Sequence, residues 1–324
     1  MSRYARQQAL PEIGEAGIAR LRQLRVLVVG AGGLSAGVLP ALAGAGVGRL
    51  RLLDPDRVEL SNLHRQTLFR SDQIGQFKVQ CAAVALQALN PEVEVQAWPQ
   101  ALQADTLTAA LQEIDLVVDA ADSVAVTYLL SDYCAAHDLP LVTAAVTGWR
   151  GYVAGVCGGG PSYRALFPNP PAGIVRCADS GVMGPVVMAI GAIQAQMALS
   201  WWLQQQPSPR GQLLQLDLAT WQTSSFRFDA APEPAPAQVF PFIAVSQLQP
   251  EDLVLELRAV EEAPQPVVAR ALRVLPEQLS EWQLPGSPAR VVLCCRSGLR
   301  AWRAAQQLVQ RQDMPPLYLL AVSG

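Results

Sequence analysis

The sequence predicts an α/β fold in which a Rossmann-like mixed, mostly parallel sheet carries helices on both faces. One observation is a glycine-rich stretch, G-A-G-G, between an apolar segment and a helical pattern. A second is the repeated alternation of short apolar segments with segments of helical periodicity, which is typical of parallel strands joined by helices. A third is the composition, because 51% of the 324 residues are hydrophobic and 16% are charged, which suits a large buried core.

The first βαβ unit predicts a nucleotide site. Residues 26–29 and 49–53 have the pattern of buried strands, and residues 34–45 that of a helix. Between them, Gly30, Gly32 and Gly33 let the backbone approach a ligand, and the start of the helix offers free N–H groups to a phosphate. Asp54 ends the second strand, where an acidic residue accepts hydrogen bonds from a ribose. The alternative without a ligand is tight packing of helix on sheet.

The remaining elements follow in order along the chain. Helical patterns cover residues 13–24, 75–89, 105–112, 124–137 and 181–203, and strand patterns cover 93–98, 115–119 and 139–144. Beyond Gly148, residues 152–156 and 212–228 alternate like antiparallel strands, which predicts a mixed sheet.

A Pro/Ala-rich stretch marks the clearest domain boundary. Residues 229–241 read D-A-A-P-E-P-A-P-A-Q-V-F-P, as in a linker. We therefore expect a large domain at 1–228 and a small α/β domain at 242–324, with strands at 253–257, 291–295 and 317–321 and a helix at 299–310.

The composition argues against several classes of partner. The net charge of −3, without a Lys/Arg block, predicts no nucleic-acid or anionic-membrane partner. The apolar run at 181–203 carries Gln194 and Gln196, which favours a buried or interface helix over a membrane span. No apolar signal region is present at the start, so we do not expect export, and the six cysteines suit a reduced cytoplasm better than a disulfide framework.

Polar residues are expected to gather at the carboxyl edge of the large sheet. Cations and carboxylates around a phosphate-binding turn suit a triphosphate with a metal ion better than a nicotinamide. Asp122 would hold Mg²⁺ through oxygen, while Arg65 and Lys78 would neutralise phosphate charge. An NAD-dependent oxidoreductase and a non-catalytic scaffold that retains the fold remain as alternatives. The full set is Arg6, Asp54, Asn62, Arg65, Gln66, Lys78 and Asp122.

Seven ordered motifs carry a resemblance to a known family. They are R-Y-A-R-Q, G-A-G-G-L-S, L-L-D-P-D, S-N-L-H-R-Q-T-L, G-Q-F-K-V, D-A-A-D-S and C-A-D-S-G-V-M-G-P. Over residues 1–228 the chain resembles the ubiquitin-activating-like MoeB/ThiF/HesA family. The resemblance implies adenylation of the C-terminal Gly-Gly carboxylate of a ubiquitin-fold sulfur-carrier protein, with ATP and Mg²⁺, and release of pyrophosphate.

The resemblance also implies roles for single residues. Asp54 corresponds to a ribose ligand, and Asp122 to the metal-linked aspartate. Arg6 resembles an arginine that reaches into the neighbouring subunit's site in family homodimers, and Cys177 matches a cysteine that joins covalently to the carrier in some members. Asn62, Arg65 and Lys78 correspond to phosphate contacts, and Ser123 to a nucleotide contact that is usually asparagine.

One departure from the family concerns a structural zinc ion. The family commonly binds zinc through two C-x-x-C pairs. Here Ser162 and Ala165 occupy the first pair, and D-A-A-P-E-P replaces the second. We therefore predict no zinc site.

The C-terminal segment predicts a second site. The stretch V-V-L-C-C-R-S-G-L-R resembles a rhodanese active loop, in which loop N–H groups, a helix dipole and two arginines favour the thiolate of Cys295. Arg300 closes this loop, and the domain is short for that fold. An active persulfide on Cys295 and a degenerate docking module are the two interpretations.

A persulfide donor such as a cysteine desulfurase would supply the sulfur. The pathway stays open among molybdopterin, thiamine, tRNA thiolation and siderophore or amino-acid synthesis.

Overall fold

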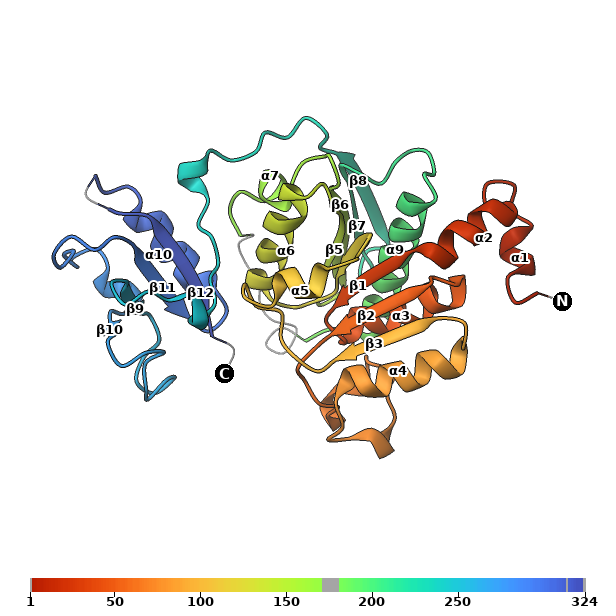
Figure 1. Ribbon diagram of the computed structural model, residues 1–324, viewed down its shortest axis with the longest axis horizontal. Helices are drawn as coiled ribbons and strands as arrows, with labels where there is room; N and C mark the ends of the chain where they lie inside the picture. Colours follow the sequence, from red (N-terminus) through yellow and green to blue (C-terminus); the bar gives the residue numbers. More distant parts are fainter. Residues whose placement is uncertain (1, 171–180, 313, 323–324) are drawn as a thin grey trace. The chain divides into compact units, whose positions relative to one another are not determined.

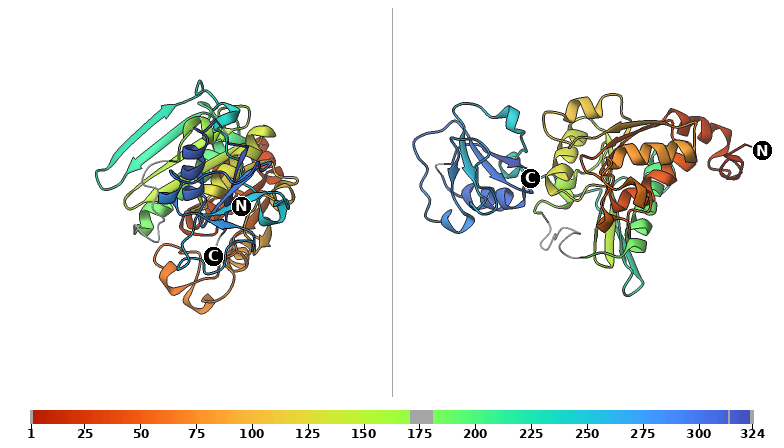
Figure 2. Two further views of the ribbon diagram at one scale, coloured as in Figure 1. Left: turned by 90° about the vertical axis from the view of Figure 1, so that its left-hand side faces the viewer. Right: turned by 90° about the horizontal axis from the view of Figure 1, so that it is seen from below.

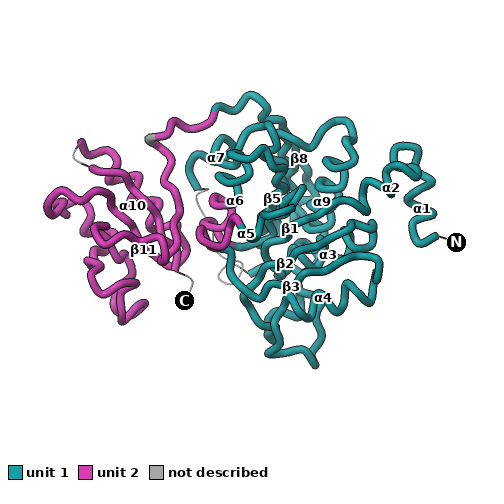
Figure 3. Tube along the Cα trace, viewed as in Figure 1, with its two compact units in different colours: residues 1–102, 109–122, 130–232 teal, residues 103–108, 123–129, 233–324 magenta. Residues whose placement is uncertain are grey.

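The computed structural model describes residues 2–170, 181–312 and 314–322, and Figure 1 shows its elements. The chain divides into two compact units (Figure 3). The first comprises residues 1–102, 109–122 and 130–232, and the second comprises residues 103–108, 123–129 and 233–324.

The first unit is built on an eight-stranded sheet. Its strands are β1 (Arg25–Val29), β2 (Arg49–Leu53), β3 (Glu94–Trp98), β4 (Leu116–Asp119), β5 (Pro140–Thr147), β6 (Arg150–Cys157), β7 (Gln212–Asp217) and β8 (Gln222–Arg227). The order is β3-β2-β1-β4-β5-β6-β7-β8, with β1 to β5 parallel and β6 to β8 antiparallel. Figure 2 shows the β7–β8 hairpin at the outer edge of the sheet. The expected mixed, mostly parallel sheet is confirmed.

Helices cover both faces of this sheet (Figure 1), because its central strands are apolar on both sides. Leu50 and Leu52 of β2 pack in one core with α3, α4 and α9, whereas Arg51 between them faces α5. The helices of this unit are α1 (Ala5–Gln8), α2 (Gly14–Gln23), α3 (Gly33–Ala45), α4 (Lys78–Leu89), α5 (Leu107–Leu111), α6 (Val124–Ala136), α7 (Tyr163–Leu166) and α9 (Gly184–Trp202), of which α5 and α6 extend into both units.

The apolar run at 181–203 forms α9, a buried helix of the first unit. Gln194, one of its two glutamines, is completely buried, and its Nε2 donates to the carbonyls of Asp119 at 2.7 Å and Val142 at 3.0 Å. These bonds tie α9 to two central strands, β4 and β5. Among the described residues, no helix has the length and apolar character needed to cross a membrane.

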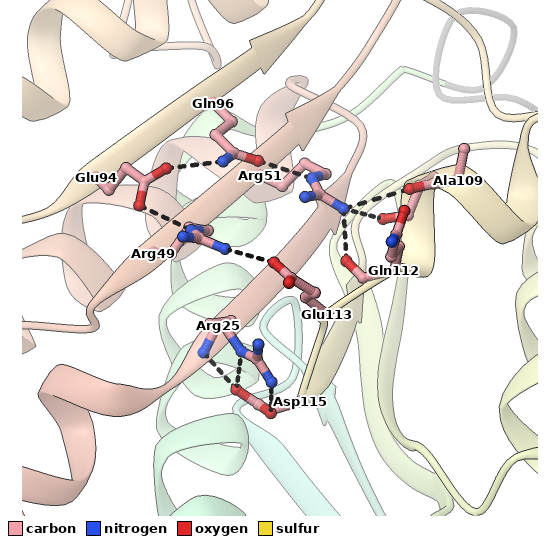
Figure 4. Close-up of polar contacts among 10 residues, drawn as sticks. Arg25, Arg49, Arg51, Glu94, Gln96, Ala109, Gln112, Glu113 and Asp115 are labelled. Carbon is pink, nitrogen blue, oxygen red and sulfur yellow. Dashed lines mark hydrogen bonds and ion pairs between the residues drawn. The ribbon is translucent and has the colours of Figure 1, made fainter.

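A polar network on the other face joins β2, β3 and α5 (Figure 4). Arg51 is buried, stacks 4.7 Å over Trp98 and donates to Oε1 of Gln96 at 2.9 Å. Its Nη1 also donates to the carbonyls of Ala110 at 2.8 Å and Gln112 at 3.0 Å, at the end of α5. A cation at this position satisfies carbonyls that the helix leaves unpaired, which explains why α5 ends before residue 112.

The second unit contains a four-stranded parallel sheet in the order β10-β9-β11-β12. Its elements are β9 (Leu253–Glu256), β10 (Leu272–Arg273), β11 (Val291–Cys295), α10 (Leu299–Leu308) and β12 (Leu317–Ala321). Glu256 is fully buried at the end of β9, where its Oε2 lies 2.7 Å from Nη2 of Arg258. Burial alone would raise the pKa of Glu256, but the hydrogen bonds from Arg258 and the Val267 N–H lower it.

Candidate nucleotide and thiol sites

The candidate nucleotide site lies where the strand order of the large sheet reverses. From β1 the chain adds β2 and β3 on one side and then places β4 on the other, so the segments after β1 and β4 are neighbours. Gly30 follows β1 with a φ of +94°, and a Cβ there would lie 2.6 Å from the carbonyl oxygen of Ala120. Only glycine fits this position. Ligands of open α/β sheets bind at such a switch point.

The glycine turn, residues 30–33, leads directly into α3. A Cβ on Gly33 would lie 2.6 Å from Cγ1 of Val187. At Gly32, the residue before the helix, no side-chain hydrogen bond caps the helix. Ser35 is buried, and its hydroxyl donates to the carbonyl of Gly30. The serine therefore fixes the turn where the dinucleotide fingerprint has a third glycine. The uncapped N–H groups at the start of α3 suit a phosphate.

Asp54 lies beside the glycine turn, and the turn holds its carboxylate. Its Oδ2 accepts the N–H of Ala31 at 2.7 Å and its Oδ1 accepts the N–H of Asp56 at 2.8 Å. Burial raises the pKa of Asp54, although Lys78 and the two N–H groups oppose the rise. Each carboxylate oxygen has a further lone pair, so Asp54 can accept ribose hydroxyls.

Lys78 is the first residue of α4, and its side chain is buried. Its Nζ lies 2.7 Å from Oδ2 of Asp56, whose side chain is 62% exposed. The helix begins at Lys78, later than the expected residue 75, because Gly75 has a φ of +87°. A buried cation at a helix N-terminus opposes the helix dipole, and here a nearby carboxylate offsets that cost.

The connection between β2 and α4 holds the other candidate phosphate contacts. Asn62 is buried in the short 3₁₀ helix η1 (Leu60–Asn62), where its Oδ1 accepts the N–H of Glu59 at 3.3 Å. The Cδ of Arg65 lies 3.7 Å from the position that a Cβ on Gly33 would occupy, so this side chain lies over the glycine turn. Its Nη1 donates to the carbonyl of Ser61 at 3.0 Å and lies 2.8 Å from Nε2 of His64. No local sequence pattern predicts this contact with His64.

Gln66, also in this connection, is buried next to the glycine turn. Its Nε2 lies 3.9 Å from the position that a Cβ on Gly32 would occupy. Its Oε1 has no hydrogen-bond partner in the part of the chain that the structure describes.

Two aspartates follow β4 and differ in their surroundings. Asp119 is fully buried and accepts the hydroxyl of Thr143 at 3.0 Å, so it supports the sheet. Asp122 is exposed, and no hydrogen bond or ion pair to its carboxylate is found among the described residues. Magnesium is commonly held by one or two carboxylates together with substrate phosphates, so Asp122 fits a magnesium ligand. Ser123 precedes α6, and its hydroxyl accepts the N–H of Val126 at 3.5 Å.

The expectation that Arg6 lies at the carboxyl edge of its own sheet is wrong. Tyr4, just before α1, packs against Gly46 at the far end of α3, and Gln7 of α1 donates to the carbonyl of Ala45 at 3.0 Å. Arg6 is therefore at the opposite end of α3 from the glycine turn. The reason is tertiary packing, since the N-terminal segment docks on the amino edge of the strands. Cys177 lies outside the described residues.

The segments where the family commonly has zinc ligands make local contacts here. The hydroxyl of Ser162 accepts the N–H of Ala165 at 3.2 Å and thereby caps α7. Asp229 pairs with Arg227 at 2.6 Å. A search of the described residues found no group of three or more His, Cys, Asp or Glu that could hold a metal ion.

The candidate thiol site lies in the second unit, at the end of β11. The Sγ of Cys295 is buried and accepts the N–H groups of Gly298 at 3.2 Å and Ala301 at 3.3 Å. Gly298 has a φ of +83°, which allows the tight turn into α10. Arg300 pairs with Glu262 and donates to the carbonyl of Leu257 at 3.4 Å. These backbone donors suit a thiolate.

Cys294, the residue before, is also buried, and burial followed by the nearby Glu256 carboxylate raises its pKa. The Sγ of Cys295, in contrast, accepts two backbone N–H groups.

Comparison with known proteins identifies relatives of this chain. A sulfur carrier protein adenylyltransferase of Thermus thermophilus is 42% identical over 209 residues, which cover 61% of this chain and 76% of that protein. An adenylyltransferase and sulfurtransferase MOCS3 of Bos taurus is 44% identical over 218 residues, which cover 66% of this chain and 48% of that protein. The chain thus spans about half the length of the MOCS3 relatives it matches.

Solved structures show the same fold. A structure of E. coli MccB with ATP has a TM-score of 0.62 at 20% identity and covers 72% of both chains. A structure of PaaA has a TM-score of 0.60 at 21% identity and covers 69% of this chain and 72% of that one. The ThiF family profile matches residues 4–236, which is well over half of the sequence. This chain therefore belongs to the ThiF family.

Proposed function

We propose that this protein adenylates the C-terminal Gly-Gly carboxylate of a small ubiquitin-fold sulfur-carrier protein in the cytoplasm, using ATP and Mg²⁺. One observation carries the proposal: the glycine turn at the start of α3, the buried Asp54 and the buried Lys78 meet at the switch point of one sheet. The family and the name of the Thermus thermophilus relative support it.

The chemistry demands little acid or base from the protein. A carboxylate is already a nucleophile, so one of its oxygens forms a bond to the α-phosphorus while the bond to the pyrophosphate oxygen breaks. The site has to align the two reactants and disperse the phosphate charge. Asp54 would bind the ribose, Asn62, Arg65 and Lys78 the phosphates, and Asp122 the magnesium ion. Ser123 would add a nucleotide contact.

Lys78 illustrates how the site can respond to a nucleotide. Its partner Asp56 is mostly exposed. The Nζ of Lys78 can therefore leave this carboxylate and bind a phosphate oxygen without moving through the buried core. Phosphate charge is also what makes a lysine favourable at the start of α4.

We further propose a homodimer in which Arg6 acts on the partner's site. The arginine is exposed on α1 and lies away from the nucleotide site of its own chain. A covalent adduct of Cys177 with the carrier belongs to the same proposal.

Cys295 is proposed to carry a persulfide in a rhodanese-like domain and to pass its terminal sulfur to the activated carrier, with a cysteine desulfurase as the sulfur donor. Attack of the terminal persulfide sulfur on the acyl-adenylate would form a carbon–sulfur bond, release AMP and leave an acyl disulfide on Cys295. A second thiol would then attack the Sγ of Cys295, break the sulfur–sulfur bond, release the thiocarboxylate and end as a disulfide with Cys295. The backbone donors around Sγ support this assignment.

The test is pyrophosphate exchange into ATP with the full chain and candidate carriers ending in Gly-Gly. Exchange should depend on a carrier and should be lost when its final glycine is removed. Absence of exchange with every Gly-Gly carrier of the source genome would overturn the proposed function.

A further inference from the structure

We propose that Glu262 makes the thiol site of the second unit selective for a protein persulfide over small, doubly charged sulfur donors such as thiosulfate. It does so by neutralising Arg300, the arginine at the end of the thiol loop (residues 295–300). This inference deepens the proposed persulfide role of Cys295 and rests on it. The sequence pattern of the loop draws attention to the arginine, whereas the structure adds the carboxylate.

The first observation is that Arg300 already has an anionic partner. Its Nη2 donates to Oε1 of Glu262, and its Nη1 donates to the carbonyl of Leu257 at 3.4 Å. The side chains of the ion pair are 37% exposed for Arg300 and 28% exposed for Glu262, so a small ligand can reach the pair. The carboxylate of Glu262 therefore occupies donors of Arg300 that the anionic group of a sulfur donor would otherwise bind.

The second observation is the balance of charge around the thiol. Arg258 pairs with Glu256 at 2.7 Å, and the loop arginine Arg300 pairs in turn with Glu262. Arg296, in the thiol loop, is exposed and makes no hydrogen bond or ion pair with the described residues. The hydrogen bond with Arg300 lowers the pKa of Glu262 most, and the charges of the other two arginines lower it further, although burial opposes them. One positive charge thus stays uncompensated, and removal of the Glu262 charge would leave two.

The third observation is that this charge acts on the thiol. The Sγ of Cys295 accepts the N–H of Ala301, the residue that directly follows Arg300. The hydrogen bond with Glu262 raises the pKa of Arg300 most, and the charges of Glu262 and Cys295 add to this rise against the effect of burial. A sulfur donor that reaches Sγ therefore enters the combined field of the arginine and its carboxylate.

The local fold does not depend on the side chain of Glu262. The N–H groups of Glu262 and Ala263 donate to the carbonyl of Ala259 at 3.1 and 2.9 Å. Nη2 of Arg273 donates to the carbonyl of Ala263 at 2.7 Å. Main-chain bonds and this arginine therefore fix the turn at 259–263, so a substitution of Glu262 reports on charge.

The charge of the donor decides how strongly the carboxylate acts. With thiosulfate, the thiolate of Cys295 attacks the sulfane sulfur, a new sulfur–sulfur bond forms, and sulfite leaves with the electron pair of the broken bond. With a protein persulfide, the thiolate attacks the terminal sulfur, and the cysteine of the donor leaves as a thiolate. Thiosulfate carries two negative charges and a persulfide at most one. Since Coulomb energy scales with the charge of the ligand, the carboxylate of Glu262 repels thiosulfate more strongly.

The experiment compares two sulfur donors with the full chain. In Glu262→Gln, which keeps the size of the side chain and removes its charge, kcat/KM for sulfur transfer from thiosulfate to cyanide should rise about fivefold. The rise should disappear in about 1 M salt, because salt screens exposed charges. Persulfide formation on Cys295 by a cysteine desulfurase supplied with cysteine should change less than about twofold.

The matched control is Glu261→Gln. Glu261 is the neighbouring carboxylate, is exposed and makes no hydrogen bond or ion pair with the described part of the chain. Its substitution removes the same charge without releasing an arginine, so both donors should react within about twofold of the wild type.

A second measurement reads the charge at the thiol without sulfur transfer. Alkylation of Cys295 is followed by peptide mass spectrometry with iodoacetate, an anion, and with iodoacetamide, a neutral reagent of similar size. The ratio of the two rate constants cancels the reactivity of the thiolate. It should rise about threefold in Glu262→Gln and stay at the wild-type value in Glu261→Gln.

The outcomes separate this inference from the proposed function. An unchanged or lower kcat/KM for thiosulfate in Glu262→Gln would overturn the selectivity, as would an equal gain with both donors or a gain that persists in high salt. A Cys295 that neither reagent alkylates would also overturn it. If no variant transfers sulfur from either donor, the persulfide role of Cys295 falls, and the alkylation ratio alone decides whether Glu262 sets the charge of the thiol site.

Discussion

At the scale of single residues, Asp54 combines a proposed ribose-binding role with a cost to stability. Its two oxygens accept backbone N–H groups, yet burial outweighs these bonds and raises the pKa of the carboxyl group above its ordinary value of 3.8. The folded protein therefore binds this proton more tightly than the unfolded chain does. Between 3.8 and the raised pKa, the contribution of Asp54 to stability falls as the pH rises.

We expect Asp54→Asn to weaken ATP binding about tenfold or more, because it removes the charged acceptor for the ribose. The variant loses one of the two backbone N–H bonds but carries no buried charge, so its melting temperature relative to that of the wild type should rise as the pH rises from 3.5 to 7. Calorimetric titration with ATP and thermal unfolding over pH 3.5 to 7 would test both parts. A difference in melting temperature between variant and wild type that does not change with pH would contradict the electrostatic argument.

The sequence could predict which residue types lie near the nucleotide but not how they pair. The order of strands and turns is sufficient to place Asp54 and Lys78 at the carboxyl edge. The ion pair of Lys78 with Asp56 and the unpaired amide of Gln66 depend on side-chain directions that no local pattern encodes. Arg6 was misplaced because a terminal segment can dock on either edge, and only its contacts with Gly46 and Ala45 decide between them.

At the scale of elements, the packing of α3 on α9 positions the glycine turn. A Cβ on Gly37 would lie 2.5 Å from the carbonyl oxygen of Met188, and one on Gly191 would lie 2.2 Å from that of Leu34. The backbones of the two helices are thus in direct contact. Their parallel course brings both N-termini to the same edge of the sheet.

Gly191→Ala should therefore lower the free energy of unfolding by about 2–3 kcal/mol, the usual cost of overpacking a tight interface. The matched control is Gly44→Ala on α3, where a Cβ meets nothing within 4 Å. It should stabilise the protein by about 0.5–1 kcal/mol, because alanine favours a helix over glycine. Urea unfolding at pH 7 measures both effects, and equal effects of the two substitutions would refute this account of the interface.

The sequence predicted most elements of the fold because apolar periodicity reports burial. The strands at 49–53, 291–295 and 317–321 have the predicted bounds. The last two are short apolar runs bordered by polar or turn residues, and in the first arginine and leucine alternate before Asp54. Helix α5 is shorter than expected because the buried Arg51 binds carbonyls at its end. Helix α7 was not predicted, since four residues in a Gly- and Pro-rich stretch give no periodic signal.

At the scale of the whole molecule, two candidate sites lie in separate compact units. The nucleotide residues from Gly30 to Lys78 belong to the first unit, and Cys295 belongs to the second. Each site is supported by its own sheet, with the glycine turn after β1 and the thiol at the end of β11. We therefore expect that the proposed activation of the carrier and the proposed supply of sulfur can be disabled one at a time.

Cys295→Ala should abolish transfer of the sulfane sulfur of thiosulfate to cyanide, a reaction in which the thiolate takes up the sulfur and sulfite leaves. Carrier-dependent pyrophosphate exchange should remain within about twofold of the wild type, because the substitution removes one Sγ and the proposed ATP contacts other than Ser123 lie in the first unit. The neighbouring Cys294→Ala is the matched control, since that thiol is buried and its pKa is raised. It should retain sulfur transfer and lose about 1 kcal/mol of stability. Loss of pyrophosphate exchange in Cys295→Ala, or sulfur transfer that depends on Cys294, would contradict this division of roles.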